Sequence, residues 1–250
     1  YLSEIENEGR FWQGKIAEKE EENLITILFN LAYISRNEIN QLVGRAFANL
    51  ENRDAWRLNE FYEKVIQNVL SGLGNNGLVK EYPELIIVTA GKYWKTIPPK
   101  EDDFSEHRLG RLTRHSLRDA ECWGIKNGHS FFPSGIYKTP ALDLLIYHPR
   151  IGLQFIIEFI NYSIEFYIKA DCEYKHNISQ LEIELNDGTL STKWAAWELW
   201  AGFRGLSVTN HLLESLLMSF EKFLLELAAR GTDVSKKNVK FIFDYVLKNS

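Results

Sequence analysis

The chain has 250 residues, 45% of them hydrophobic and 25% charged, which is the composition of a globular protein with one large domain or two small ones. A formal net charge of -5 excludes a general attraction to nucleic acid or anionic membranes, although a local basic patch stays compatible with it. Two cysteines are too few for a disulfide framework, although the sequence is compatible with a single disulfide between them. No apolar stretch without charged residues is long enough to span a membrane. We therefore expect a cytoplasmic protein.

The first 97 residues are expected to form a helical subdomain. Residues 22–33 carry an apolar stripe at helical spacing, made of Leu24, Ile27, Leu28 and Leu31. Ser35 is expected to cap a second helix that ends near Leu50, with Glu38 at its third position and Ile34 and Ile39 as a hydrophobic staple.

Two further helices are predicted in the same subdomain. One begins near Asp54 and has a long apolar stripe, formed by Leu58, Phe61, Tyr62, Val65, Ile66, Val69 and Leu70. It ends in the run SGLGNNG. The other begins at Pro83, because proline lacks the N–H group that the first turn of a helix leaves unpaired.

Residues 98–138 interrupt the helical pattern with prolines, opposite charges and turn residues, and we interpret them as an irregular charged insertion. Within it, four arginines fall at spacings that would line a basic helical stripe: Arg108, Arg111, Arg114 and Arg118. Guanidinium groups suit phosphate oxygens or carboxylates. Because an acidic run from Glu101 to Glu106 lies nearby, salt bridges or a protein interface are favoured over contact with phosphate or nucleic acid.

Residues 139–250 are expected to form a second helical subdomain. One helix is predicted to begin at Pro140, with Thr139 as its N-cap residue. A second is predicted to begin at Pro149; it has two apolar faces and should therefore lie between neighbouring helices. Apolar and polar residues alternate near residues 179–193, on either side of a two-residue turn at Asp187-Gly188, and this pattern predicts a β-hairpin. Helices resume with the segment WAAWELWAGF and continue over about 209–229 and 239–247.

Together these elements predict a mainly α fold, an irregular helical array or an α-solenoid-like stack of helix pairs with one β-hairpin. Stacked antiparallel helix pairs are typical of solenoids. No fixed period with matching residues is visible, so a helical bundle fits the pattern as well.

No strong catalytic, nucleotide or metal motif is present. Gly72, Gly74 and Gly77 match GxGxxG, but they follow a helix rather than a strand, so a helix end with a tight turn is the favoured interpretation. A P-loop sequence is absent, and the histidines and cysteines lack zinc-ligand spacing. Cys122 beside His115 or His129 is a possible nucleophile, but a lone cysteine is more often a buried apolar group. We expect no cofactor and no catalysis.

Two aromatic groups are candidates for a partner interface. Phe131 and Phe132 lie between polar turns and either return into the core, which is favoured, or anchor a partner. Trp194, Trp197 and Trp200 recur every three residues, which suits a peptide groove but more often reflects packing.

Two stretches in the second half, residues 135–161 and 199–227 with the turn FRG, resemble helical segments found downstream of the ATPase core in very large bacterial anti-phage defence proteins of the STAND/AAA type. Such proteins join a nucleotide-hydrolysing module, an effector and a helical sensing or scaffolding array. The resemblance implies that this chain is part of the array. It brings no site residue with it.

The sequence therefore predicts a non-catalytic scaffold or partner-recognition segment of a larger protein, the alternative being a nucleic-acid or phosphate-binding module that uses the arginine stripe. A first residue Tyr1 and the single methionine Met218 agree with a piece of a longer chain. The expected partners are other domains of that chain, a protein partner or a second copy, and no membrane.

Overall fold

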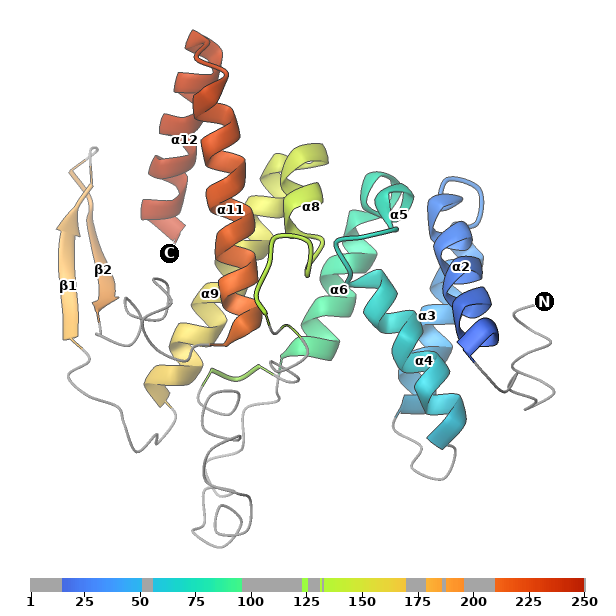
Figure 1. The fold of residues 1–250 in the computed structure, drawn as a ribbon. Coiled ribbons are helices and arrows are strands. Elements are labelled where there is room, and N and C mark those ends of the chain that lie inside the picture. The colour runs from blue at the N-terminus through green and yellow to red at the C-terminus, as the bar shows by residue number, and fades with distance from the viewer. Residues whose placement is uncertain are drawn as a thin grey trace, which may run out of the picture. The chain divides into compact units, whose positions relative to one another are not determined.

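The computed structural model describes residues 15–50, 56–95, 123–125, 131, 133–169, 179–185, 188–195 and 210–249. Over these residues the chain is mainly helical with one two-stranded antiparallel hairpin, as the sequence predicts (Figure 1). It divides into two compact units, Tyr1–Lys92 and Tyr93–Ser250. The division therefore lies close to the predicted end of the first subdomain, while much of the predicted insertion lies outside the described residues.

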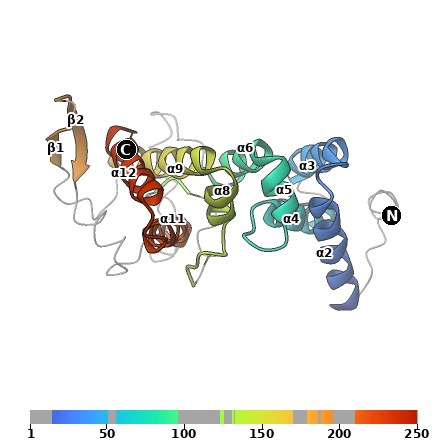
Figure 2. The same cartoon turned by 90° about the horizontal axis from the view of Figure 1, so that it is seen from above.

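The first unit is built from α2 (Lys15–Asn30), α3 (Arg36–Leu50), α4 (Trp56–Val69), α5 (Asn76–Glu81) and most of α6 (Pro83–Trp94). Helix α3 packs on α4, and α2 packs on both α4 and α5. The view from above separates α3 from α4, which overlap in the first view (Figure 2). The apolar stripe predicted for α4 forms the core here, with each of these side chains at most 3% exposed: Phe61, Tyr62, Val65, Ile66, Val69 and Leu70.

The buried face of α2 differs from the predicted one. Ile25, Phe29 and Ala32 are at most 1% exposed, whereas Ile27 is 55% exposed and Leu31 is 38% exposed. The core thus receives the row that lies one residue along the helix from the predicted row. Two adjacent apolar rows are present in this helix, and only the neighbouring helices decide which of them is buried.

The predicted capping arrangement at Ser35 is wrong, although α3 does begin at Arg36. The Ser35 hydroxyl donates backward to the carbonyl of Leu31 at 2.7 Å, so it closes the end of the preceding helix. Ile34 is 66% exposed and therefore cannot form the predicted staple with the buried Ile39. A hydroxyl can donate and accept at the same time, but no backbone N–H of the first turn of α3 donates to Ser35 Oγ in the described part of the chain, so the predicted side-chain cap does not form.

The glycine-rich run is a tight connection between helices. Gly74 has a φ of +81°, the left-handed conformation that favours glycine at a helix end. The Asn30 amide donates to the Gly74 carbonyl at 3.0 Å and its oxygen accepts from the Gly77 N–H at 3.3 Å. A Cβ on Gly77 would lie 2.6 Å from the Asn30 backbone, so this glycine permits a close approach of α5 to the end of α2.

The second unit contains α8 (Ala141–Tyr147), α9 (Pro149–Lys169), α11 (His211–Ala229) and α12 (Asp233–Asn249). Helix α11 packs on α8, α9 and α12, and α8 packs on α9. At the beginning of the unit, the Trp94 indole is 1% exposed and meets three phenylalanine rings, those of Phe131, Phe155 and Phe159. Aromatic side chains of α9 therefore supply much of this core.

Two details of the predicted helix starts change. Helix α8 begins one residue later than predicted, with Pro140 as its N-cap residue, and the fully buried Thr139 hydroxyl finds no partner among the described residues. Helix α12 begins at Asp233, about six residues before the predicted start at Val239. Its first turn has Val234 as its one apolar residue, so the apolar spacing alone did not reveal it.

The hairpin pairs β1 (Ser179–Glu184) with β2 (Leu190–Ala195). The Leu185 N–H donates to the Thr189 carbonyl and the Gly188 N–H donates to the Leu185 carbonyl, both at 2.8 Å, with Gly188 at a φ of +77°. The loop thus spans residues 186–188, and the predicted two-residue turn is wrong. A turn followed by a left-handed glycine is the usual form of three-residue hairpin loops.

Candidate functional site

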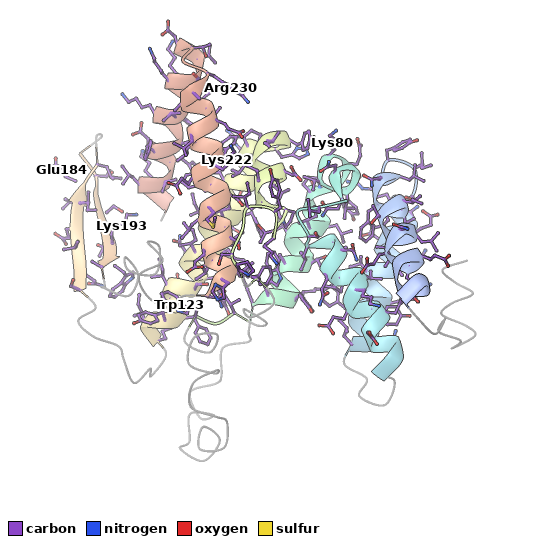
Figure 3. The ribbon with its side chains drawn as sticks, viewed as in Figure 1. Lys80, Trp123, Glu184, Lys193, Lys222 and Arg230 are labelled. Atoms are coloured by element: carbon purple, nitrogen blue, oxygen red, sulfur yellow. The ribbon has the colours of Figure 1, made fainter. Side chains whose placement is uncertain are left out.

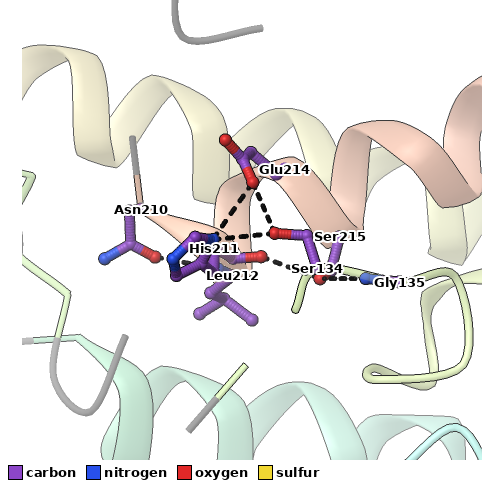
Figure 4. A network of polar contacts seen from close by, with 7 residues as sticks. All are labelled: Ser134, Gly135, Asn210, His211, Leu212, Glu214 and Ser215. Carbon is purple, nitrogen blue, oxygen red and sulfur yellow. Dashed lines mark hydrogen bonds and ion pairs between the residues drawn. The ribbon is translucent and has the colours of Figure 1, made fainter. Parts of the chain in front are cut away.

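A polar network joins the loop before α8 to the first turn of α11 (Figure 4). Ser134 Oγ lies 2.9 Å from Nδ1 of His211 and donates a hydrogen bond to Oε2 of Glu214. Nδ1 of His211 lies 3.2 Å from the same Oε2. Asn210 caps the helix by accepting from the Leu212 N–H at 3.0 Å, which fixes the turn that carries both His211 and Glu214.

Two more hydrogen bonds extend this network along α11. The Gly135 N–H donates to the Ser215 hydroxyl at 3.1 Å, and the Ser219 hydroxyl lies 3.3 Å from the Ile136 carbonyl. Three successive residues of the loop, 134–136, are therefore held by one face of α11. Because Ser215 and Ser219 are each 0% exposed, these contacts are inside the unit.

The residue types Ser, His and Glu invite comparison with a catalytic triad, but the geometry differs. In a triad, the serine and the carboxylate contact opposite nitrogens of the imidazole, so that a proton can pass from serine to histidine. Here Ser134 and Glu214 meet the same nitrogen, Nδ1. The Ser134 hydroxyl also contacts Glu214 directly, so the three polar groups meet at one point. The arrangement clamps the loop to the helix.

A second group surrounds Lys95, just after α6. Its Nζ lies 4.7 Å from the ring centre of Tyr162 and 5.3 Å from that of Phe159, as in cation–π contacts. Desolvation of the half-buried amine lowers the pKa of Lys95, and the negative charge of Glu158 partly opposes this shift. The backbone of Lys95 also forms an isolated antiparallel β-bridge with that of Ile125.

The short segment 123–125 packs on α9 beside this lysine. Trp123, labelled in Figure 3, stacks on Tyr167 with ring centres 4.5 Å apart. The Tyr162 hydroxyl donates to the Gly124 carbonyl at 3.2 Å. Gly124 has a φ of +65°, and a Cβ there would meet the Phe166 ring at 2.5 Å. The cation and the rings therefore hold a strand-like segment against the helix, which is a packing role.

Among the described residues, no group of three or more His, Cys, Asp or Glu side chains is placed to hold a metal ion. The same part of the chain contains no helix with the length and apolarity needed to cross a membrane. Glu158 and Glu165 of α9 are exposed, and Glu165 pairs with Lys169 at 3.8 Å. They therefore do not form a buried carboxylate pair for acid–base catalysis.

Most of the predicted site residues lie outside the described residues: Arg108, Arg111, Arg114, Arg118, Cys122, Phe132, Trp197 and Trp200. Phe131 is 8% exposed, and its ring meets the Trp94 ring edge-on with the ring centres 5.6 Å apart. Phe131 therefore packs in the core, which was the favoured prediction, and is not an exposed anchor for a partner. Trp194 belongs to β2 rather than to a helix, and it is 40% exposed. The prediction that a helix already includes Trp194 is therefore wrong, because the strand continues to Ala195.

The sequence did not indicate the network of Ser134, His211 and Glu214. Residues three apart in a helix share a face, so His211 and Glu214 could have been paired from their spacing. Ser134 lies far from both in the sequence, and no local signal joins them. A comparison of the chain with protein-family models and with curated proteins finds no match.

Proposed function

We propose that this chain is a non-catalytic scaffold and partner-recognition segment of a larger protein, in which α12 binds an apolar surface of another domain. The observation that carries the proposal is the exposure of large apolar side chains on α12. Phe241 is 59% exposed, Phe243 is 53% exposed and Val234 is 68% exposed, whereas Ile242 between the two rings is 7% exposed.

The arrangement of these side chains around α12 shows why one packed neighbour does not cover them. Successive residues of an α-helix are about 100° apart, so Phe241 and Phe243 lie on opposite flanks of Ile242, about 200° from each other. Helix α11 packs on α12 and covers the Ile242 side. An apolar arc this wide is typical of a helix that lies between neighbours.

The remaining face of α12 is polar and carries charged side chains, among them Lys237 and Lys240. A helix with one polar strip and two bare apolar flanks is suited to the interior of a helix stack, where each unit covers the next. Contiguous exposed apolar patches mark interaction surfaces in other proteins, and on one flank the rings of Phe241 and Tyr245 lie with their centres 6.3 Å apart. The resemblance to defence proteins names the class of larger protein that would supply the neighbouring domain, a bacterial anti-phage ATPase.

The polar groups favour a binding role over a catalytic one. Among the described residues, Ser134 and Glu214 meet the same nitrogen of His211 rather than opposite ones, and the half-buried Lys95 faces aromatic rings of its own unit. Both arrangements stabilise local structure. Exposed large apolar side chains also occur elsewhere in the described part of the chain, for example Ile34 and Leu225, but α12 carries two exposed phenylalanines within three residues.

The complete reading frame around this segment tests the proposal. We expect it to be much longer than 250 codons and to encode a GxxxxGK[ST] sequence upstream of Tyr1 in the same frame. A complete gene of about this length, or a longer one without a nucleotide-binding motif, would contradict the assignment to a defence ATPase.

A further inference from the structure

No strand in the described ranges pairs with either edge of the hairpin, and the two edges differ in charge. Leu185 and Thr189 form a hydrogen-bonded pair, and antiparallel pairs alternate between hydrogen-bonded and non-hydrogen-bonded. In the printed register the non-hydrogen-bonded pairs are Glu184 with Leu190, Glu182 with Thr192 and Gln180 with Trp194. The backbone N–H and C=O groups of these residues therefore point away from the hairpin, along its two edges.

Among the described residues the sheet has no third strand. The side chains of β1 are exposed throughout, and Leu190 of β2 is 68% exposed. Figure 3 labels Glu184 on β1 and Lys193 on β2. Exposed edges of this kind template pairing with another strand unless charge, proline or a bulge blocks them.

The β1 edge is blocked against a second copy of itself. Antiparallel pairing about a two-fold axis at Glu182 would place this carboxylate directly opposite its own copy. A shift to an axis at Ile183 would place Glu182 opposite Glu184 twice. Like charges directly opposite each other destabilise a strand pair, so these acidic residues disfavour association through β1.

The β2 edge has no such obstacle. About a two-fold axis at Thr192, this threonine faces its own copy, Leu190 faces Trp194 of the second copy, and Ser191 faces Lys193. Threonine pairs and pairs of an aromatic with an aliphatic side chain are favourable across strands. An axis at Lys193 would bring two ammonium groups together, and an axis at Ser191 would place Leu190 opposite Thr192, which loses the contact with Trp194.

We propose that two copies of this chain associate through the β2 edge, with a two-fold axis at Thr192, to form a four-stranded sheet in the order β1-β2-β2-β1. Self-pairing of one edge is an isologous contact, so it closes as a dimer and does not grow into a filament. Leu190 and Trp194 of both copies lie on one face of the joined sheet. This surface is separate from α12, and the inference does not depend on the proposed function.

The first test compares two proline variants that alter equivalent edge positions. Thr192→Pro removes the N–H groups that would pair at the axis, two by symmetry, and each bond contributes a factor of about five, so the dimer should weaken roughly thirtyfold. Glu182→Pro removes an outward N–H of the other edge and serves as the matched control, because outward edge positions tolerate proline. Sedimentation velocity over a concentration series measures both. A parent chain that stays monomeric, or equal loss in both variants, would overturn the inference.

The second test identifies the axis and does not depend on proline. Thr192→Lys and Thr192→Glu should each weaken the dimer, because like charges would face each other. A mixture of the two variants should restore association as a heterodimer, seen by native mass spectrometry. Failure of the mixture to form heterodimers in preference to either homodimer would show that Thr192 does not face its own copy.

Discussion

Gly152 of α9 provides a direct measure of how closely α8 and α9 pack. A Cβ built on this glycine lies 2.7 Å from the backbone nitrogen of Leu145 and 2.8 Å from the carbonyl carbon of Leu144. Ordinary contacts begin at 3.4 Å, so the helices would have to separate by about 0.7 Å at this point. The atoms in the way are backbone, which cannot rotate aside as a side chain can. Gly152→Ala should therefore destabilise the second unit.

The magnitude follows from two opposing terms. Alanine in place of glycine within a helix stabilises by about 0.5–1 kcal/mol, while overpacking a dense contact costs about 1–3 kcal/mol. Because the obstructing atoms are backbone, the overpacking cost lies in the upper part of its range, about 2–3 kcal/mol, and we expect a net loss of about 1–2.5 kcal/mol in the free energy of unfolding. Gly91→Ala in α6 is the matched control, because no atom lies within 4 Å of its added Cβ and only the helix gain applies.

Urea unfolding followed by circular dichroism measures both variants. The reasoning requires that the midpoint fall for Gly152→Ala and rise or stay unchanged for Gly91→Ala. A Gly152→Ala protein at least as stable as the parent would refute the close approach of α8 and α9 that the structure shows.

Three further changes test other parts of the account. Ser134→Ala should cost about 1–3 kcal/mol in unfolding free energy, because the partly buried Glu214 loses a donor, and an esterase activity that disappears with this variant would contradict the clamp interpretation. The pKa of Lys95 is lowered in the fold, so the unfolded chain binds more protons between the lowered pKa and about 10.5, and stability should rise with pH through that window. Lys95→Met should flatten this rise in pH-dependent melting curves, and an unchanged slope would count against desolvation of the amine. Mixed DNA and RNA should not be retained at low salt; retention that falls steeply with salt and is lost in Arg111→Ala with Arg118→Ala would instead establish the phosphate-binding alternative.

Helices with one clear apolar row were predictable from the sequence. The stripe of α4 and the proline at the start of α6 mark these helices without reference to neighbours. Helix α2 was harder, because Ile25 and Phe29 lie beside an equally apolar row, and burial is decided by the helices that pack on it. The position of the Ser35 side chain was equally out of reach, because it follows the end of the preceding helix, where the hydroxyl donates to Leu31.

The candidate sites show where sequence reasoning ends. Spacing within one element places His211 and Glu214 on one face of a helix, but the approach of Ser134 depends on how a distant loop packs. The predicted hairpin loop was one residue too short, because the strands pair in a register shifted by one residue from the predicted one. The register also determines which backbone groups point outward at the edges of the hairpin. Exposure of Phe241 and Phe243 is likewise a tertiary property, because the same apolar spacing is compatible with full burial.

The central claim, that α12 recognises another domain of a larger protein, is tested most directly by hydrogen exchange. The amides of α12 should exchange at least about tenfold more slowly in the complete protein than in the chain of residues 1–250, because docking protects a helix that is otherwise covered on one side. Helix α4 is the internal control, since its apolar side chains are already buried within the chain. Equal exchange of α12 in the two proteins, with α4 also unchanged, would contradict the claim.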